Sequence, residues 1–181
     1  LTTEFGAIEL VGRSSSGVGV RIIDSAISTT GASTSGEVGG NITIIGRTSG
    51  SSSSVQLDID STSSVIAADG AITLKTISGD ANIGGVVDAG AHLLTIVSGE
   101  DLNLNDVALV GGNIDLSADN DVNITSGTSI SGPSSASGNV VLLSENFEGF
   151  SQGSTSPGAN DIALDNGWEN LHFETLDFVS D

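Results

Sequence analysis

Residues 112–116 read Gly112-Asn113-Ile114-Asp115-Leu116, a glycine followed by aliphatic residues that alternate with polar ones. The same pattern, with a looser copy at His92, starts at residues 6, 40, 70, 92, 112 and 138, so neighbouring copies lie 20 to 34 residues apart. Such alternation places aliphatic side chains on one face of a β-strand and polar ones on the other. A strand that returns at this spacing is typical of proteins built from stacked repeats.

Two further short alternating segments follow the glycine pattern in most repeats. The second segments are 18–22, 55–59, 81–83, 102–104 and 122–124, and the third are 26–27, 65–66, 86–87, 107–109 and Ile130. Three short strands per repeat predict an all-β protein, a three-faced parallel β-solenoid of about six or seven turns. Gly, Ser, Asp and Asn lie between the segments, as turns require. No segment has helical periodicity over ten residues, so no helix is predicted.

Asparagine recurs at the position after the repeat glycine. Asn41, Asn113 and Asn139 occupy this equivalent position. Their amides could stack as a ladder along the solenoid, or asparagine could be present only because it suits the turn conformation.

The composition predicts a thin aliphatic core. Apolar residues make up 37% of the chain and aromatic residues only 3%, which suits repeats that each bury one layer between their neighbours. The alternative, a disordered chain, would follow from low hydrophobicity and high net charge. The regular alternation of Ile, Leu and Val argues against it.

The last 35 residues differ from the rest. We therefore predict a solenoid domain over 1–146 and a cap, or an inter-subunit docking segment, over 147–181. Five of the six aromatic residues lie in this segment: Phe147, Phe150, Trp168, Phe173 and Phe178. Their size does not suit a thin repetitive interior, but it suits an end of the solenoid or a contact with another subunit, so we assign them to assembly.

The net charge of −19 restricts the partners. The chain has 23 acidic residues and four basic ones, and no Lys or Arg follows Lys75. Nucleic acids and anionic membrane surfaces are excluded because contacts with phosphate need cations. No apolar run of 18 residues is present, so no membrane insertion is expected.

One string suggests a calcium site. Asp119, Asp121 and Asn123 match the opening of an EF-hand loop, but Ile124 stands where that loop needs glycine and no glutamate follows at the twelfth position. These three residues are the metal candidates, with Ca²⁺ as the ion; no other cofactor is expected.

We expect no enzymatic activity. Asp58 with Asp60, and Asp119 with Asp121, are spaced to share a strand face and could converge as the carboxylates of a polysaccharide-cleaving enzyme. However, the basic residues are scattered. The two histidines, His92 and His172, have no nucleophile partner at a recognisable spacing, and both are expected to be exposed. Polysaccharide binding or cleavage stays as the alternative function.

Residues Gly99 to Leu143 carry a resemblance to a family. They include Asp101-Leu102-Asn103-Leu104, then Gly112-Asn113-Ile114-Asp115-Leu116 and Asp121-Val122-Asn123-Ile124. This stretch resembles the repeats of filamentous-haemagglutinin-type exoproteins and other large bacterial surface adhesins, with a looser likeness over 6–143. The resemblance implies a right-handed parallel β-helix, export to the bacterial surface, and a mechanical or adhesive role.

These observations together predict a secreted, non-enzymatic structural protein at the cell surface. The absence of Cys agrees with an extracellular protein held by a long hydrogen-bond ladder instead of disulfides. The solenoid forms the shaft of an adhesin, or it associates with itself end to end into a filament. A carbohydrate or a host cell surface is a further candidate partner.

Overall fold

The computed structural model describes residues 1–4, 6–31, 40–49, 55–132 and 140–144. These residues form fifteen β-strands in two sheets and contain no helix. The all-β prediction is therefore confirmed. Among the described residues, no helix is long and apolar enough to cross a membrane.

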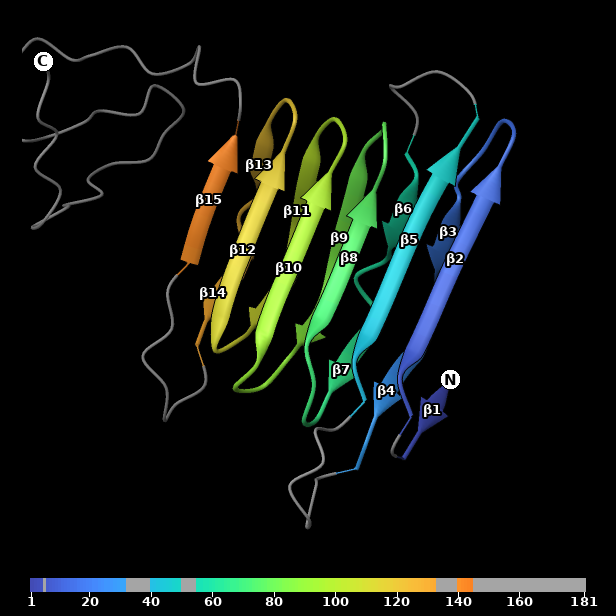
Figure 1. Cartoon of the computed structure of the whole chain (residues 1–181). Helices are drawn as coiled ribbons and strands as arrows, with labels where there is room; N and C mark the ends of the chain where they lie inside the picture. Colours follow the sequence, from blue (N-terminus) through green and yellow to red (C-terminus); the bar gives the residue numbers. More distant parts are fainter. Residues whose placement is uncertain (5, 32–39, 50–54, 133–139, 145–181) are drawn as a thin grey trace, which may run out of the picture. The chain divides into compact units, whose positions relative to one another are not determined.

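One sheet has six strands, drawn side by side in front of the other sheet in Figure 1. Its strands are β2 (Ile8–Ser14), β5 (Ile42–Thr48), β8 (Ile72–Thr76), β10 (Leu93–Ser98), β12 (Asn113–Ala118) and β15 (Val140–Ser144). They follow one another across the sheet in chain order, and every neighbouring pair is parallel.

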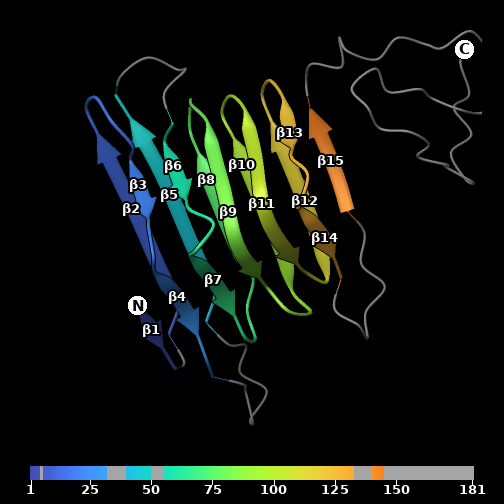
Figure 2. The same cartoon turned by 180° about the vertical axis from the view of Figure 1, so that it is seen from behind.

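The other sheet has nine strands and is seen from its own side in Figure 2. Its strands are β1 (Thr2–Thr3), β3 (Val20–Ile22), β4 (Ala26–Thr29), β6 (Leu57–Ile59), β7 (Ser64–Ala67), β9 (Ala81–Asp88), β11 (Leu102–Val110), β13 (Val122–Ile124) and β14 (Ser129–Ser131). The chain leaves the six-stranded sheet, adds to this one, and returns to add the next strand of the first. All its strand pairs are parallel as well.

The strand register matches the alignment of the glycine pattern. Ile8 pairs with Ile42, and Ile42 pairs with Ile72. Leu94 pairs with both Ile72 and Ile114, which places the looser copy at His92 in step with the others. The irregular spacing of the copies therefore arises between the strands and leaves their pairing unchanged.

The predicted second and third segments also occupy equivalent positions in successive repeats. They are separate strands in β3 and β4, β6 and β7, and β13 and β14, but they join into one strand in β9 and in β11. The register shifts between Leu104 and Val107, where the chain turns from the second segment into the third. Only Gly84 and Gly85 separate the two segments in β9, so the sequence leaves no room there for a turn that interrupts pairing.

The core lies between the inner faces of the two sheets. Its buried apolar residues form one cluster made only of Ile, Leu, Val and Ala, as the composition predicts. The largest fully buried side chains come from both sheets: Ile42, Ile44, Leu57, Ile59, Ile72, Leu74, Ile83, Leu94, Ile96, Leu102, Leu104 and Leu109. Residues 147–181, predicted as a cap or docking segment, lie outside the described residues.

Candidate functional site

A column of polar side chains runs across five strands of the nine-stranded sheet. Its members are paired in register on β3, β6, β9, β11 and β13, and they are Arg21, Asp58, Asn82, Asn103 and Asn123. Each stands between two inward aliphatic residues of its strand, so strand alternation directs it outward.

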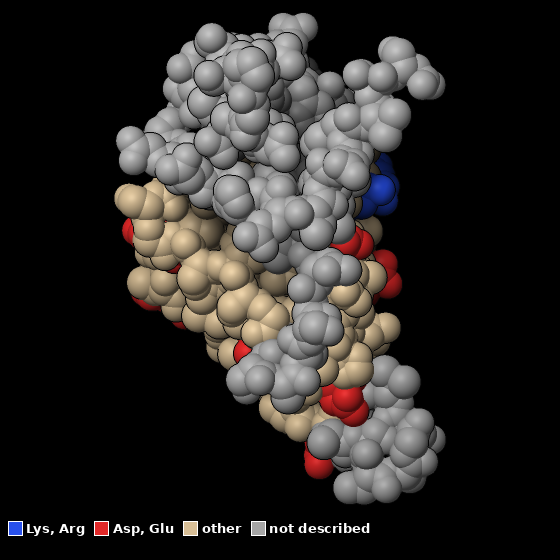
Figure 3. Space-filling model, turned by 90° about the vertical axis from the view of Figure 1, so that its left-hand side faces the viewer, with Lys and Arg blue, Asp and Glu red and all other residues tan. Residues whose placement is uncertain are grey.

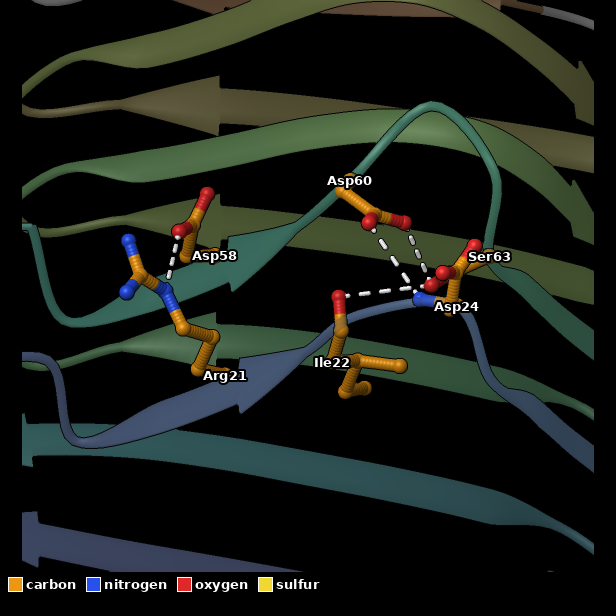
Figure 4. A network of polar contacts seen from close by, with 6 residues as sticks. All are labelled: Arg21, Ile22, Asp24, Asp58, Asp60 and Ser63. Atoms are coloured by element: carbon orange, nitrogen blue, oxygen red, sulfur yellow. Dashed lines mark hydrogen bonds and ion pairs between the residues drawn. The ribbon is translucent and has the colours of Figure 1, made fainter.

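An ion pair begins this column. Arg21 Nε donates to Asp58 Oδ2 at 2.8 Å, and the two side chains lie on neighbouring strands (Figure 4). The arginine side chain is 57% exposed, so solvent weakens the attraction. The pair nevertheless gives Asp58 a partner in the adjacent repeat.

Asparagine side chains continue the column as an amide ladder. Asn103 Nδ2 donates to Asn82 Oδ1 at 2.9 Å, and Asn123 Nδ2 donates to Asn103 Oδ1 at 3.0 Å. The ladder thus exists, but it uses different residues from the predicted ones. Asn41 accepts a hydrogen bond from the Ala71 backbone N–H at 2.9 Å, with alanine rather than asparagine in the next repeat. Asn139 lies outside the described residues.

Asp60 engages a different set of groups from Asp58. Its carboxylate accepts hydrogen bonds from Ser63 Oγ at 2.6 Å, Thr62 Oγ1 at 3.0 Å and the Asp24 backbone N–H at 3.2 Å. The Ser63 hydrogen bond, ahead of the other contacts, lowers the pKa of Asp60 below its ordinary value. In Figure 4 the Asp58 carboxylate points to Arg21 and the Asp60 carboxylate to Asp24 and Ser63. Their predicted convergence is therefore not observed.

The corner that precedes β11 and β13 carries a second ladder, made of aspartates. Asp80 Oδ1 accepts from the Asp101 N–H at 3.2 Å, and Asp101 Oδ1 accepts from the Asp121 N–H at 3.2 Å. Asn120 Nδ2 also donates to Asp101 Oδ1, at 2.6 Å. Each carboxylate thus satisfies backbone donors of the next repeat.

The three calcium candidates lie at this corner and in the strand that follows it. Asp119 and Asp121 are exposed, and Asn123 is the last described member of the amide ladder. In the part of the chain that the structure describes, no group of three or more His, Cys, Asp or Glu side chains is arranged to hold a metal ion. Calcium binding by Asp119, Asp121 and Asn123 stays a prediction.

His92 differs from the expected exposed residue. It takes the place of the repeat glycine, is half-buried, and its Nε2 lies 2.8 Å from Asp69 Oδ1 in the preceding repeat. This contact could not be predicted from local sequence, because 23 residues separate the partners. His172 and the assembly candidates Phe147, Phe150, Trp168, Phe173 and Phe178 lie outside the described residues.

The amide ladder corresponds to a recurring triplet in the sequence. Asn82, Asn103 and Asn123 each stand in the middle of an aliphatic–Asn–aliphatic triplet, in three successive second segments. No protein-family model, no curated protein and no solved structure matches this chain. The proposed function therefore rests on the ion pair and hydrogen bonds described above.

Proposed function

We propose that the chain is a right-handed, three-faced parallel β-helix with a non-enzymatic structural role outside the cell. Three strand positions per repeat support this fold: one in the six-stranded sheet and two rows, which begin with β3–β6 and β4–β7, in the nine-stranded sheet. Each return of the chain adds the next strand. Right-handedness follows from the strong preference of crossover connections between parallel strands. In this role the protein forms the shaft of a surface adhesin, or it stacks head to tail into a filament.

The repeated parallel register is the observation that carries the proposal. Ile8, Ile42, Ile72, Leu94 and Ile114 pair in succession across the six-stranded sheet, so each described repeat presents the same backbone pattern to the next. An unpaired edge is a template for a further strand. A parallel stack that adds strands in one direction makes a head-to-tail contact, and such contacts extend into fibres when they do not close.

The ladders support a structural role because they engage polar side chains between repeats. Asp58, Asp101, Asn82 and Asn103 contact neighbouring repeats through ion pairs or hydrogen bonds. A hydrolase needs two carboxylates that converge on one substrate bond, whereas Asp58 and Asp60 serve separate networks.

The filament proposal is tested by a truncation. A chain that ends at residue 146 is expected to lose polymerisation, because the aromatic segment 147–181 then cannot dock on the next subunit. Negative-stain electron microscopy of both chains, with and without Ca²⁺, gives the length and yield of filaments. Filaments of equal length and yield from the truncated chain would show that 147–181 plays no part in assembly.

The polysaccharide alternative is tested with the same protein. Polysaccharide cleavage by the wild-type chain that is lost in Asp58→Ala or Asp119→Ala would contradict the non-enzymatic role. Circular dichroism of the variants controls for loss of the fold.

A further inference from the structure

A row of side chains crosses the six-stranded sheet near the arrowhead ends of its strands in Figure 1. Arg13 of β2 pairs in register with Arg47 of β5, and both follow an inward glycine, so both point outward. Because Gly46 of β5 pairs with Thr76 of β8, Ile77 comes level with Arg47 directly after β8. The Ile77 side chain is 46% exposed.

The row continues through the corners that follow β10 and β12. Gly99 lies against the backbone of Ile77, since a Cβ on Gly99 would lie 2.5 Å from the Ile77 carbonyl carbon. The Asp119 N–H donates to the Ser98 carbonyl at 3.1 Å, which places Asp119 level with Gly99. Asp119 is exposed, and Glu100, next to Gly99 in the chain, is half-buried. We define the charged row as Arg13, Arg47, Ile77, Gly99 with Glu100, and Asp119.

The arginines of the charged row have no acidic partner in the part of the chain that the structure describes. Arg21 pairs with Asp58 on the other sheet, but no ion pair there includes Arg13 or Arg47. Like charges directly opposite one another on neighbouring strands destabilise a sheet, so the arginine pair gains from a nearby carboxylate. Arg47 Nε is buried, which leaves the terminal nitrogens of its guanidinium to meet a partner.

The charged row is complementary to itself when it is reversed. A twofold axis through Ile77, along the strand direction, places a second copy against the row with its stack of repeats running the opposite way. Arg13 then faces Asp119 of the second copy, because β2 and β12 both lie two strands from β8. Arg47 faces the corner with Glu100, one strand from β8, and Ile77 meets its own copy. An isologous contact of this kind makes each pair twice.

Lys75 restricts the contact to one side of the charged row. It occupies the outward position before Ile77 on β8, so across the same axis it would meet its own copy, and like charges there would repel. The contact therefore lies on the other side of Ile77, toward the corners that carry Glu100 and Asp119.

The net charge of −19 opposes association of two copies at long range. In Figure 3, Asp and Glu side chains (red) are visible at several places and Lys and Arg (blue) at one. Salt at physiological ionic strength screens exposed charges beyond about 8 Å. Under these conditions the charge pairs in contact outweigh the repulsion between distant carboxylates.

We propose that the charged row is the contact surface of an antiparallel, side-by-side homodimer. Ile77 lies at its centre, where apolar side chains contribute most to binding, and Arg13 and Asp119 pair at both ends. The inference goes beyond the proposed structural role, because it assigns a partner to the side of the stack and does not require end-to-end assembly.

Sedimentation equilibrium of the full-length protein at physiological ionic strength measures the dimer. Arg13→Asp and Asp119→Arg are each expected to raise its dissociation constant about tenfold or more, because each replaces two attractive charge pairs with two repulsive ones. The double variant with both substitutions has both pairs again in the opposite sense and is expected to dimerise like the wild type. An equimolar mixture of the two single variants is expected to form a heterodimer for the same reason.

Lys75→Gln is the matched control for Arg13→Gln, because both remove one positive charge from the same sheet face. Arg13→Gln is expected to weaken the dimer, whereas Lys75→Gln should dimerise at least as well as the wild type. Circular dichroism checks that each variant folds. Ile77→Ser, which is expected to weaken the dimer without a change of charge, replaces the charge swaps if they do not fold.

Three results would overturn the homodimer. They are a monomer at every wild-type concentration, a dimer of unchanged affinity in both single variants, and a folded double variant that stays as weak as the single ones. The head-to-tail filament uses the ends of the stack, so its presence or absence does not enter this test and the two proposals can fail separately.

Discussion

At the scale of single residues, buried polar side chains hold the corner where the chain leaves the six-stranded sheet. Gln56 is fully buried. Its Oε1 accepts from the Ile77 and Ser78 backbone N–H groups at 3.0 and 3.3 Å, and its Nε2 donates to Thr48 Oγ1 at 3.2 Å and Ser78 Oγ at 3.0 Å. One buried side chain thus satisfies two backbone donors of the corner, and its own amide would be costly to bury without these partners.

In the next two repeats, hydroxyl groups make the hydrogen bonds to the backbone at the equivalent corner. Ser98 Oγ donates to the Asp101 carbonyl at 2.7 Å and accepts from the Ala81 N–H at 3.1 Å. Thr76 Oγ1 accepts from the Gly99 N–H at 3.0 Å. The alternating pattern of the sequence could not identify these polar residues as buried, because it assigns only apolar residues to the inward face.

Asp60 provides a prediction for pH dependence. Ser63 and its other partners lower the pKa of Asp60 from its ordinary value of 3.8. Because the folded-state pKa lies below the unfolded-state one, Asp60 stabilises the fold above its unfolded-state pKa, and this contribution is lost as the pH falls through the folded-state value. The substitution Ser63→Ala is expected to raise the pKa of Asp60 in an NMR titration of its carboxyl carbon. An unchanged pKa in this variant would contradict the assigned cause.

At the scale of strands, the repeat glycine has a steric cause. A Cβ at Gly40 would lie 2.1 Å from the Gly6 carbonyl oxygen, and one at Gly112 would lie 2.1 Å from the Ala91 carbonyl oxygen. The backbones of neighbouring repeats therefore approach too closely for a side chain at this position. His92 replaces the glycine in one repeat. In the turn before it, Gly90 has a φ of 55°, a backbone conformation that glycine adopts without steric strain.

Gly40→Ala is therefore expected to destabilise the protein. Overpacking of this kind costs about 1–3 kcal/mol, because the new Cβ can be accommodated only if the backbones of two repeats separate. Urea unfolding followed by circular dichroism measures the loss. Gly17→Ala is the control, since its Cβ would lie 3.5 Å from Ser14 Oγ. Equal stabilities of the two variants would contradict the steric explanation.

Much of the strand arrangement could be predicted from the sequence. The order of the strands and their register follow from the glycine pattern and the period-two alternation, because both fix which residues face inward. The fusion of two segments in β9 and β11, and the contact of His92 with Asp69, could not be predicted. Both depend on how corners of neighbouring repeats stack, which the alternation within the strands does not specify.

The candidate sites were less predictable than the strands. Asp58 and Asp60 share a predicted strand face. However, the chain turns after Ile59, and the Asp60 carboxylate accepts hydrogen bonds from Ser63 and from the Asp24 backbone N–H. Arg13 of β2 and Arg47 of β5 pair in register. This neighbourhood was not predicted, although Gly12-Arg13 and Gly46-Arg47 repeat the same dipeptide. Sequence spacing alone does not tell which partner a side chain meets in the next repeat.

At the scale of the whole molecule, repeats that use one register can add further repeats at an open edge. The described repeats pair with one another through their backbones. The amide and aspartate ladders add side-chain hydrogen bonds between the repeats that contain β9, β11 and β13. A second copy that meets β2 in the same way would continue the backbone ladder across the subunit boundary. The filament proposal requires this continuity.

Cryo-electron microscopy of the full-length chain, over a range of concentrations, tests the head-to-tail stack most directly. The account predicts filaments in which strands lie across the axis at a spacing of about 4.8 Å that continues from one subunit into the next. Isolated particles at every concentration, or filaments in which this spacing is interrupted between subunits, would contradict it.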